Sequence, residues 1–170
     1  MATTELTHPD LHHLRAAVGW LELGNACEAG EEIARISPDH LDHPEVLKVR
    51  WQICAAGQSW DAALPIAQRM VETAPEEAQS WIQRSYALRR ARETGLQLAW
   101  EALLPAAKLF PREPIIPFNL ACYAAQFGKL DEALDWLRKA MDASRDRRAI
   151  KTMALADRDL EPLWGRIRDL

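Results

Sequence analysis

Four alanines recur at nearly even intervals along the chain and place the tightest limit on its fold. They lie 34, 36 and 34 residues apart, at Ala29, Ala63, Ala99 and Ala133. In each copy, small or apolar residues follow the alanine at the fourth and seventh positions, such as Leu137 and Ala140 in the last copy. These positions share one face of a helix, and small side chains there let two helices approach closely. The repeat therefore predicts a stack of helix pairs.

Glycines and prolines divide each copy into two helices. A glycine, which tolerates the left-handed backbone of a helix end, lies four to six residues before each leading alanine, at Gly24, Gly57, Gly95 and Gly128. We expect first helices near residues 9–23, 44–56, 76–92 and 115–127, and second helices near 26–37, 60–73, 96–109 and 130–143. Pro65 and Pro105 lie inside second helices, where proline should kink the helix or shift its start.

The segment from Asn119 to Leu134, which has the pattern of helix, glycine turn and helix, resembles the tetratricopeptide repeat (TPR) family. The resemblance implies an all-α, right-handed solenoid of about four helix-turn-helix units with a C-terminal capping helix. We expect a tail over residues 1–8, units over about 9–43, 44–75, 76–111 and 112–145, and a capping segment over 146–170. Chain length alone favours one cooperative body. In the capping segment, Asp159 is the expected N-cap of an apolar helical face formed by Leu160, Leu163, Trp164 and Ile167.

Composition favours a soluble cytoplasmic protein. The three cysteines, Cys27, Cys54 and Cys122, form no CxxC spacing and do not match a secreted disulfide scaffold. The first residues have neither the basic start nor the apolar region of a secretory signal. The most apolar stretch, residues 96–110, contains two charges and is shorter than the ~20 apolar residues of a spanning helix. We therefore expect no membrane segment.

Charge is distributed unevenly. Residues 1–85 contain 6 Lys and Arg against 13 Asp and Glu, whereas residues 86–170 contain 15 against 12. A molecule with this polarity can attract an acidic partner to its C-terminal half. The net charge of −4 and the absence of a nucleic-acid-binding motif argue against nucleic acid as the partner. The predicted basic patch comprises Arg138, Lys139, Arg145, Arg147, Arg148 and Lys151.

The TPR resemblance implies a concave groove lined by the first helices. By that resemblance, the groove residues are Lys48, Gln52, Gln79, Gln83, Tyr86, Arg89, Arg90, Ile115, Phe118, Asn119, Cys122 and Gln126. Their guanidinium, amide and aromatic groups suit a peptide or an acidic surface. The plainer interpretation is that the arginines only solvate a helix. The places that would hold a carboxylate clamp for chaperone tails are occupied by Leu14, Val18, Gln79 and Gln83, so that mode is not expected.

No motif for catalysis, metal or cofactor stands out, and we expect none of the three. Histidines 8, 12, 13, 40 and 43 are interpreted as solvated loop and cap residues, because zinc needs three or four convergent ligands. Cys54 and Cys122 are interpreted as small buried thiols. Phosphate-binding GxxxxGK[ST] and GxGxxG patterns are missing. Most of the seven tryptophans are expected to pack between helices, with Trp60 and Trp136 as the better surface candidates.

These features favour a non-catalytic adaptor or scaffold that binds another protein through its groove and basic C-terminal half. The chain is similar to short, stand-alone bacterial TPR proteins, which include a kinesin-light-chain-like member associated with bacterial tubulin filaments. That resemblance implies an acidic cytoskeletal partner. The alternatives are a TPR-class secretion chaperone that binds an effector segment, suggested by Glu113 to Phe118, and a small enzyme. We expect a monomer with at most weak self-association.

Overall fold

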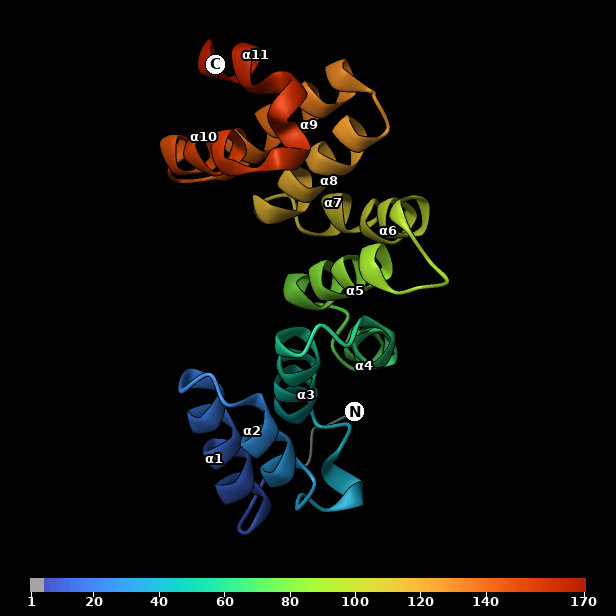
Figure 1. Cartoon of the computed structure of the whole chain (residues 1–170), viewed down its shortest axis with the longest axis vertical. Coiled ribbons are helices and arrows are strands. Elements are labelled where there is room, and N and C mark those ends of the chain that lie inside the picture. The colour runs from blue at the N-terminus through green and yellow to red at the C-terminus, as the bar shows by residue number, and fades with distance from the viewer. Residues whose placement is uncertain (1–4) are drawn as a thin grey trace. The chain divides into compact units, whose positions relative to one another are not determined.

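The computed structural model describes residues 5–170 as helices joined by short turns, with no strand among them (Figure 1). It divides into two compact units, of which the first ends at Gly95 and the second begins at Leu96. This boundary lies inside the predicted third repeat, residues 76–111, and was not indicated by the chain length. Within the described residues, no helix combines the length and the apolar character needed to cross a bilayer.

The first unit, coloured blue to green in Figure 1, consists of helices that pack on their neighbours along the chain. Its elements are α1 (Asp10–Glu22), α2 (Ala26–Ile33), the 3-10 turn η1 (Pro38–His40), α3 (Pro44–Ala56), α4 (Trp60–Thr73) and α5 (Ala78–Arg90). α1 packs on α2, α3 on α4, and α4 on α5. The expected first and second helices of this region are therefore confirmed within a few residues.

The second unit, coloured yellow to red, is built around the packed pair α8 and α9. Its elements are α6 (Leu96–Leu103), α7 (Ala106–Leu109), α8 (Ile115–Gln126), α9 (Leu130–Ala143), α10 (Arg147–Ala156), the 3-10 turn η2 (Arg158–Leu163) and α11 (Trp164–Arg168). The helix α10 packs on α9, and η2 packs on α8.

The leading alanines of all four copies are fully buried, with 0% exposure at Ala29, Ala63, Ala99 and Ala133. The residues four and seven positions later are also buried in every copy, as at Leu137 and Ala140. This confirms the interpretation of the repeat: the alanines mark the stripe along which helices come closest.

The two internal prolines have different effects. Pro105 separates α6 from α7 and occupies the N-cap position of α7, as the sequence predicts. Pro65, by contrast, lies within α4, which continues from Trp60 to Thr73. Since proline has no N–H, the carbonyl of Asp61 cannot receive its usual helical hydrogen bond from residue 65. The helix tolerates this loss because Ala63, Ala67 and Met70 are buried against neighbouring elements.

The turns between paired helices use left-handed backbone, but not always at glycine. Gly128 has a φ of 74° at the end of α8, as expected. At the end of α3, Gly57 has a φ of −83°, and the left-handed residue is Gln58, with a φ of 52°. The prediction was therefore wrong by one residue in this turn, where a non-glycine residue adopts the strained conformation.

The C-terminal segment packs through the predicted apolar residues but begins differently. Leu160, Leu163 and Ile167 are buried, and the indole N–H of Trp164 donates to the carbonyl of Ala154 at 3.1 Å. The N-cap is Asp157, whose side chain accepts from the amide of Asp159 at 2.9 Å, so the expectation of Asp159 as the cap was wrong. The apolar residues begin in the 3-10 turn η2, which follows α10 and is capped by Asp157.

Candidate functional site

An aromatic cluster with a guanidinium group over it joins three helices of the first unit. Tyr86 and Arg90 come from α5, Trp60 begins α4 and Trp51 lies on α3. The ring of Tyr86 lies 5.4 Å from that of Trp60 and 6.4 Å from that of Trp51. The Arg90 guanidinium lies 3.4 Å from the centroid of the Tyr86 ring and 5.4 Å from that of Trp60. The three rings are half-buried, so the cluster presents part of its aromatic surface beside a positive charge, a combination that is common at protein interfaces.

The predicted groove residues of the first unit differ in accessibility. Gln52, Gln79 and Arg90 are exposed, whereas Lys48, Tyr86 and Arg89 are half-buried. Gln83 is buried, with 6% exposure, so it offers a partner little surface. The buried residues of α5 include Ser80 and Ile82 as well as Gln83, so the buried face of this helix is wider than the sequence pattern indicates.

Lys48 is held by two carboxylates. Its Nζ atom lies 2.9 Å from Glu45 Oε1 and 3.2 Å from Glu77 Oε2, which links α3 to the residue that precedes α5. The hydrogen bonds to Glu45 and Glu77 raise the pKa of Lys48, because both favour the charged amine. Its charge is therefore largely matched within the unit, which makes Lys48 a weaker anchor for an acidic partner than the sequence suggested.

The predicted groove residues of the second unit are mostly internal. Phe118 and Cys122 are buried on α8, and Ile115 and Asn119 are half-buried. α8 is buried on nearly all sides, because α9 and η2 both pack on it, and Phe118 and Cys122 therefore present little surface for a partner. Gln126 is exposed, and its amide donates to the carbonyl of Asp159 at 3.4 Å.

The predicted basic patch separates into paired and unpaired cations. Arg138 is bonded to Asp135 at 2.8 Å, and Arg147 to Asp142. Lys151 donates to the carbonyl of Arg168 at 2.8 Å. The remaining three, Lys139, Arg145 and Arg148, are exposed and form no ion pair with a described residue. These three residues, which we call the free cations, carry the positive charge that the patch presents to solvent.

One of the free cations borders an aromatic pocket. The Nζ atom of Lys139 lies 3.9 Å from the centroid of the Trp136 ring on α9. Both residues line a cavity of about 330 Å³ together with Phe110, Pro111 and Pro117. Trp136 also packs edge-on against Trp100, at 6.1 Å between ring centroids. Trp136 is half-buried and lies between the half-buried ring of Trp100 and the exposed cation of Lys139.

Two histidines form part-buried pairs with carboxylates that the sequence does not indicate. His40 Nδ1 lies 2.6 Å from Asp10 Oδ2, and His13 Nδ1 lies 2.8 Å from Glu32 Oε2. Both pairs are part-buried, so the interpretation of these histidines as solvated residues was wrong. His43 does act as a cap, since its ring accepts from the amide of Glu45 at 3.2 Å. Spacing along the chain could not show these pairs, because their members lie 19 and 30 residues apart.

The sulfur of Cys122 and the carboxylates of Asp157 and Asp159 are the described groups closest to a metal-ligand arrangement. Their ligand atoms lie within 4.8 Å of one another, and the sulfur lies 3.5 Å from Asp157 Oδ2. Asp157 already uses Oδ1 as a helix cap. Closed zinc sites use four cysteine or histidine ligands, and this set does not match them.

Solved structures of other proteins support this all-helical architecture. No protein-family model matches the chain, and no curated protein matches it in sequence. Its similarity to solved structures shows that the chain has the TPR fold. It aligns with the TPR protein TTC0263 of Thermus thermophilus at a TM-score of 0.66 and 20% identity, over 95% of this chain and 100% of that one.

Two structures of MamA are also similar. The form from Desulfovibrio magneticus RS-1 aligns at a TM-score of 0.71 and 18% identity, over 80% of this chain and 76% of that one. MamA of MSR-1 aligns at a TM-score of 0.65 and 22% identity, over 77% of this chain and 74% of that one. At these identities the likeness concerns the fold alone.

Proposed function

We propose that this chain is a non-catalytic adaptor that binds a protein with an acidic surface. The observation that carries the proposal is the set of free cations, Lys139, Arg145 and Arg148, on the second unit. That unit has a net charge of +1, whereas residues 1–95 have a net charge of −5. An acidic partner is attracted to the second unit and repelled by the first, which orients the encounter.

Aromatic groups beside the cations add a short-range contribution. Lys139 lies over Trp136, and Arg90 lies over Tyr86. Trp, Tyr and Arg dominate the binding energy of many protein interfaces. We therefore retain Gln52, Gln79, Tyr86, Arg89, Arg90, Asn119 and Gln126 as proposed contact residues. We assign Gln83, Phe118 and Cys122 to the interior.

The particular partner we propose is an acidic filament such as that of bacterial tubulin, which the resemblance to kinesin-light-chain-like bacterial proteins suggests. The proposal includes four TPR-like units over residues 9–145 with a cap over 146–170, action in the cytoplasm as a monomer, and no cofactor. Helix pairs with buried alanine stripes suit a rigid platform for another protein.

Charge reversal with a matched control tests the proposal. The test variant is K139E/R145E/R148E. The control, R15E/K108E/R158E, makes the same charge change at three other exposed residues that form no ion pair with a described residue. Co-sedimentation with bacterial tubulin filaments should show at least tenfold weaker binding for the test variant, about 1.4 kcal/mol, and less than threefold for the control. Equal losses would exclude the free cations as the binding surface, and wild-type protein that stays in the supernatant would exclude this partner.

A further inference from the structure

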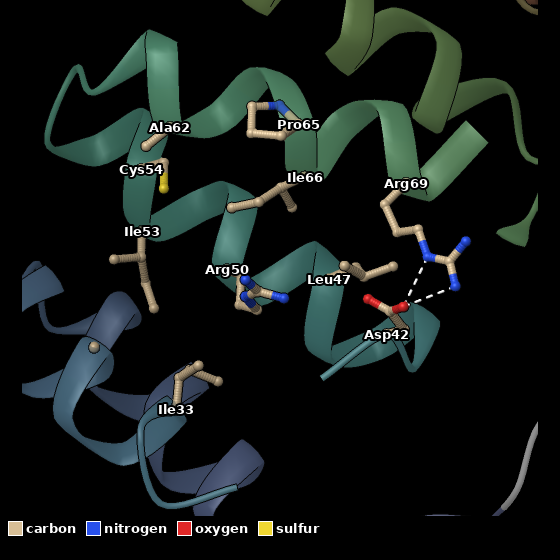
Figure 2. A pocket seen from close by; sticks show the side chains of 11 residues that line it. Ile33, Asp42, Leu47, Arg50, Ile53, Cys54, Ala62, Pro65, Ile66 and Arg69 are labelled. Atoms are coloured by element: carbon tan, nitrogen blue, oxygen red, sulfur yellow. Dashed lines mark hydrogen bonds and ion pairs between the residues drawn. The ribbon is translucent and has the colours of Figure 1, made fainter. Parts of the chain in front are cut away.

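A cavity of about 540 Å³ opens between α2, α3 and α4 of the first unit (Figure 2). Aliphatic side chains form most of its wall, including Ile33 of α2, Leu47 and Ile53 of α3, and Ile66 of α4. Its volume lies in the range of pockets that hold small molecules, about 300–1,000 Å³.

The cavity lies on the side of α3 away from the predicted groove. Successive helical residues are rotated by about 100°, so Lys48 and Gln52 share one face while Arg50 and Cys54 share the opposite face. Arg50 and Cys54 line the cavity, and Lys48 and Gln52 do not. The cavity is therefore a different site from the one proposed for a protein partner.

Two residues that weaken helices line this cavity. Gly30 lies in the middle of α2, although a Cβ atom at that position would meet nothing within 4 Å. Glycine there destabilises the helix relative to alanine, without a close neighbour that requires it. Pro65 removes a backbone donor from the middle of α4. At Gly30 the missing side chain leaves open space at the cavity wall.

The cavity contains one guanidinium group that no carboxylate neutralises. Arg50, which is half-buried, donates to the carbonyl of Leu41 at 3.1 Å and forms no ion pair with a described residue. Arg69 at the rim is different, because it is bonded to Asp42 at 2.7 Å and to Glu72 at 3.3 Å. Figure 2 shows the Arg69–Asp42 pair at one edge and Arg50 among the aliphatic side chains. A ligand would therefore meet one guanidinium group without a carboxylate partner among aliphatic side chains, with the paired Arg69 and Asp42 at the rim.

We propose that this cavity binds a small aliphatic carboxylate, with its hydrocarbon chain against Ile33, Ile53 and Ile66 and its carboxylate on Arg50. A guanidinium group can donate two parallel hydrogen bonds to one carboxylate, and such charge-assisted bonds are strong when partly shielded from water. Burying the chain removes apolar surface from water. The inference does not depend on the proposed protein partner.

Calorimetric titration of the full-length protein with decanoate, below its micellar concentration, tests this site. Gly30→Met should fill the cavity and weaken binding at least tenfold. Gly19→Met is the matched control, because Gly19 is also a helical glycine whose Cβ would meet nothing within 4 Å, but it does not line the cavity. Its affinity should stay within twofold of wild type. Absence of decanoate binding to wild type, or equal binding by both variants, would overturn the proposal.

The role of the Arg50 charge is tested by comparing the affinity for decanoate with that for the uncharged decanol. Wild-type protein should prefer decanoate at least tenfold, and Arg50→Met should remove that preference. A retained preference would exclude Arg50 as the carboxylate partner.

Cysteine alkylation supplies a readout that needs no variant. Cys54 lines the cavity, whereas Cys27 is exposed elsewhere on the unit. Decanoate should slow alkylation of Cys54 at least fivefold and leave Cys27 unchanged, as followed by peptide mass spectrometry. Unchanged alkylation of Cys54 under saturating decanoate would overturn the proposal even if a variant failed to fold.

Discussion

At the scale of single residues, the buried carboxylate of Asp10 connects three parts of the first unit. It has 5% exposure and begins α1, accepts from the amide of Ser37 at 3.1 Å and from the Ser37 hydroxyl, and lies 2.6 Å from His40 Nδ1. A buried polar group must be hydrogen-bonded to be tolerated, and each carboxylate oxygen here has a partner. Asp10 therefore fixes the chain between α2 and α3 against the start of α1.

This arrangement predicts a specific dependence of stability on pH. The hydrogen bonds from His40 and Ser37 lower the pKa of Asp10 from 3.8 to about 2. Because the pKa is lower in the folded state, the stabilisation is complete above pH 3.8 and is lost as the pH falls toward 2. The free energies of unfolding of wild type and Asp10→Asn, measured in urea from pH 6 to pH 2, should converge as the pH falls from 3.8 toward 2. A constant difference between the two free energies across this range would show that Asp10 does not contribute.

The leading alanines give a second prediction at this scale. Ala133 has 0% exposure, so Ala133→Leu forces three additional carbons into a packed stripe and should destabilise the protein by about 1–3 kcal/mol. The same substitution at Ala149, an exposed residue of α10 in the same unit, should change the free energy of unfolding by less than about 0.5 kcal/mol. Denaturant unfolding measures both. A tolerated leucine at residue 133 would contradict the close helix approach.

At the scale of elements, the sequence predicts the span of α4 but not the effect of its internal proline. The pattern predicts its span of 60–73 correctly, yet it gives the same expectation for Pro65 as for Pro105. Only Pro105 interrupts its helix, between α6 and α7, whereas α4 continues through Pro65 over 14 residues. Local propensity therefore identifies both weak points but does not show at which of them the helix breaks.

Replacing Pro65 should therefore stabilise α4. Pro65→Ala restores an N–H for the carbonyl of Asp61 and should increase the free energy of unfolding by about 1–3 kcal/mol. Pro75→Ala, at an exposed proline just beyond the helix, should instead lower it slightly, because it only frees the unfolded chain. Thermal and urea unfolding distinguish the two. A destabilised Pro65→Ala protein would show that the proline suits the helix as it stands.

The candidate site was less predictable than the helices. The TPR resemblance implied that Gln83, Phe118 and Cys122 lie on a binding face, but a resemblance does not show how many elements of this chain cover a helix. α8 is covered by α6, α7, α9 and η2, and η2 comes from the distant end of the chain. Likewise, the pairing of Lys48 with Glu77 and of His40 with Asp10 depends on residues that only the fold brings together. The uneven distribution of charge along the chain, by contrast, could be counted from the sequence alone.

At the scale of the whole molecule, charge distinguishes the two units. Residues 1–95 have a net charge of −5 and residues 96–170 a net charge of +1. The free cations belong to the second unit, and the arginines that are matched by carboxylates contribute little net field. We therefore predict binding that is electrostatic at long range and aromatic at short range.

The salt dependence of binding shows whether the free cations attract the partner. The dissociation constant for a purified acidic partner, with bacterial tubulin filaments as the first choice, is measured between about 50 and 500 mM NaCl. We predict a loss of affinity of at least about tenfold over that range, because salt screens exposed charges beyond a few ångströms. An affinity that stays constant across the titration would contradict it.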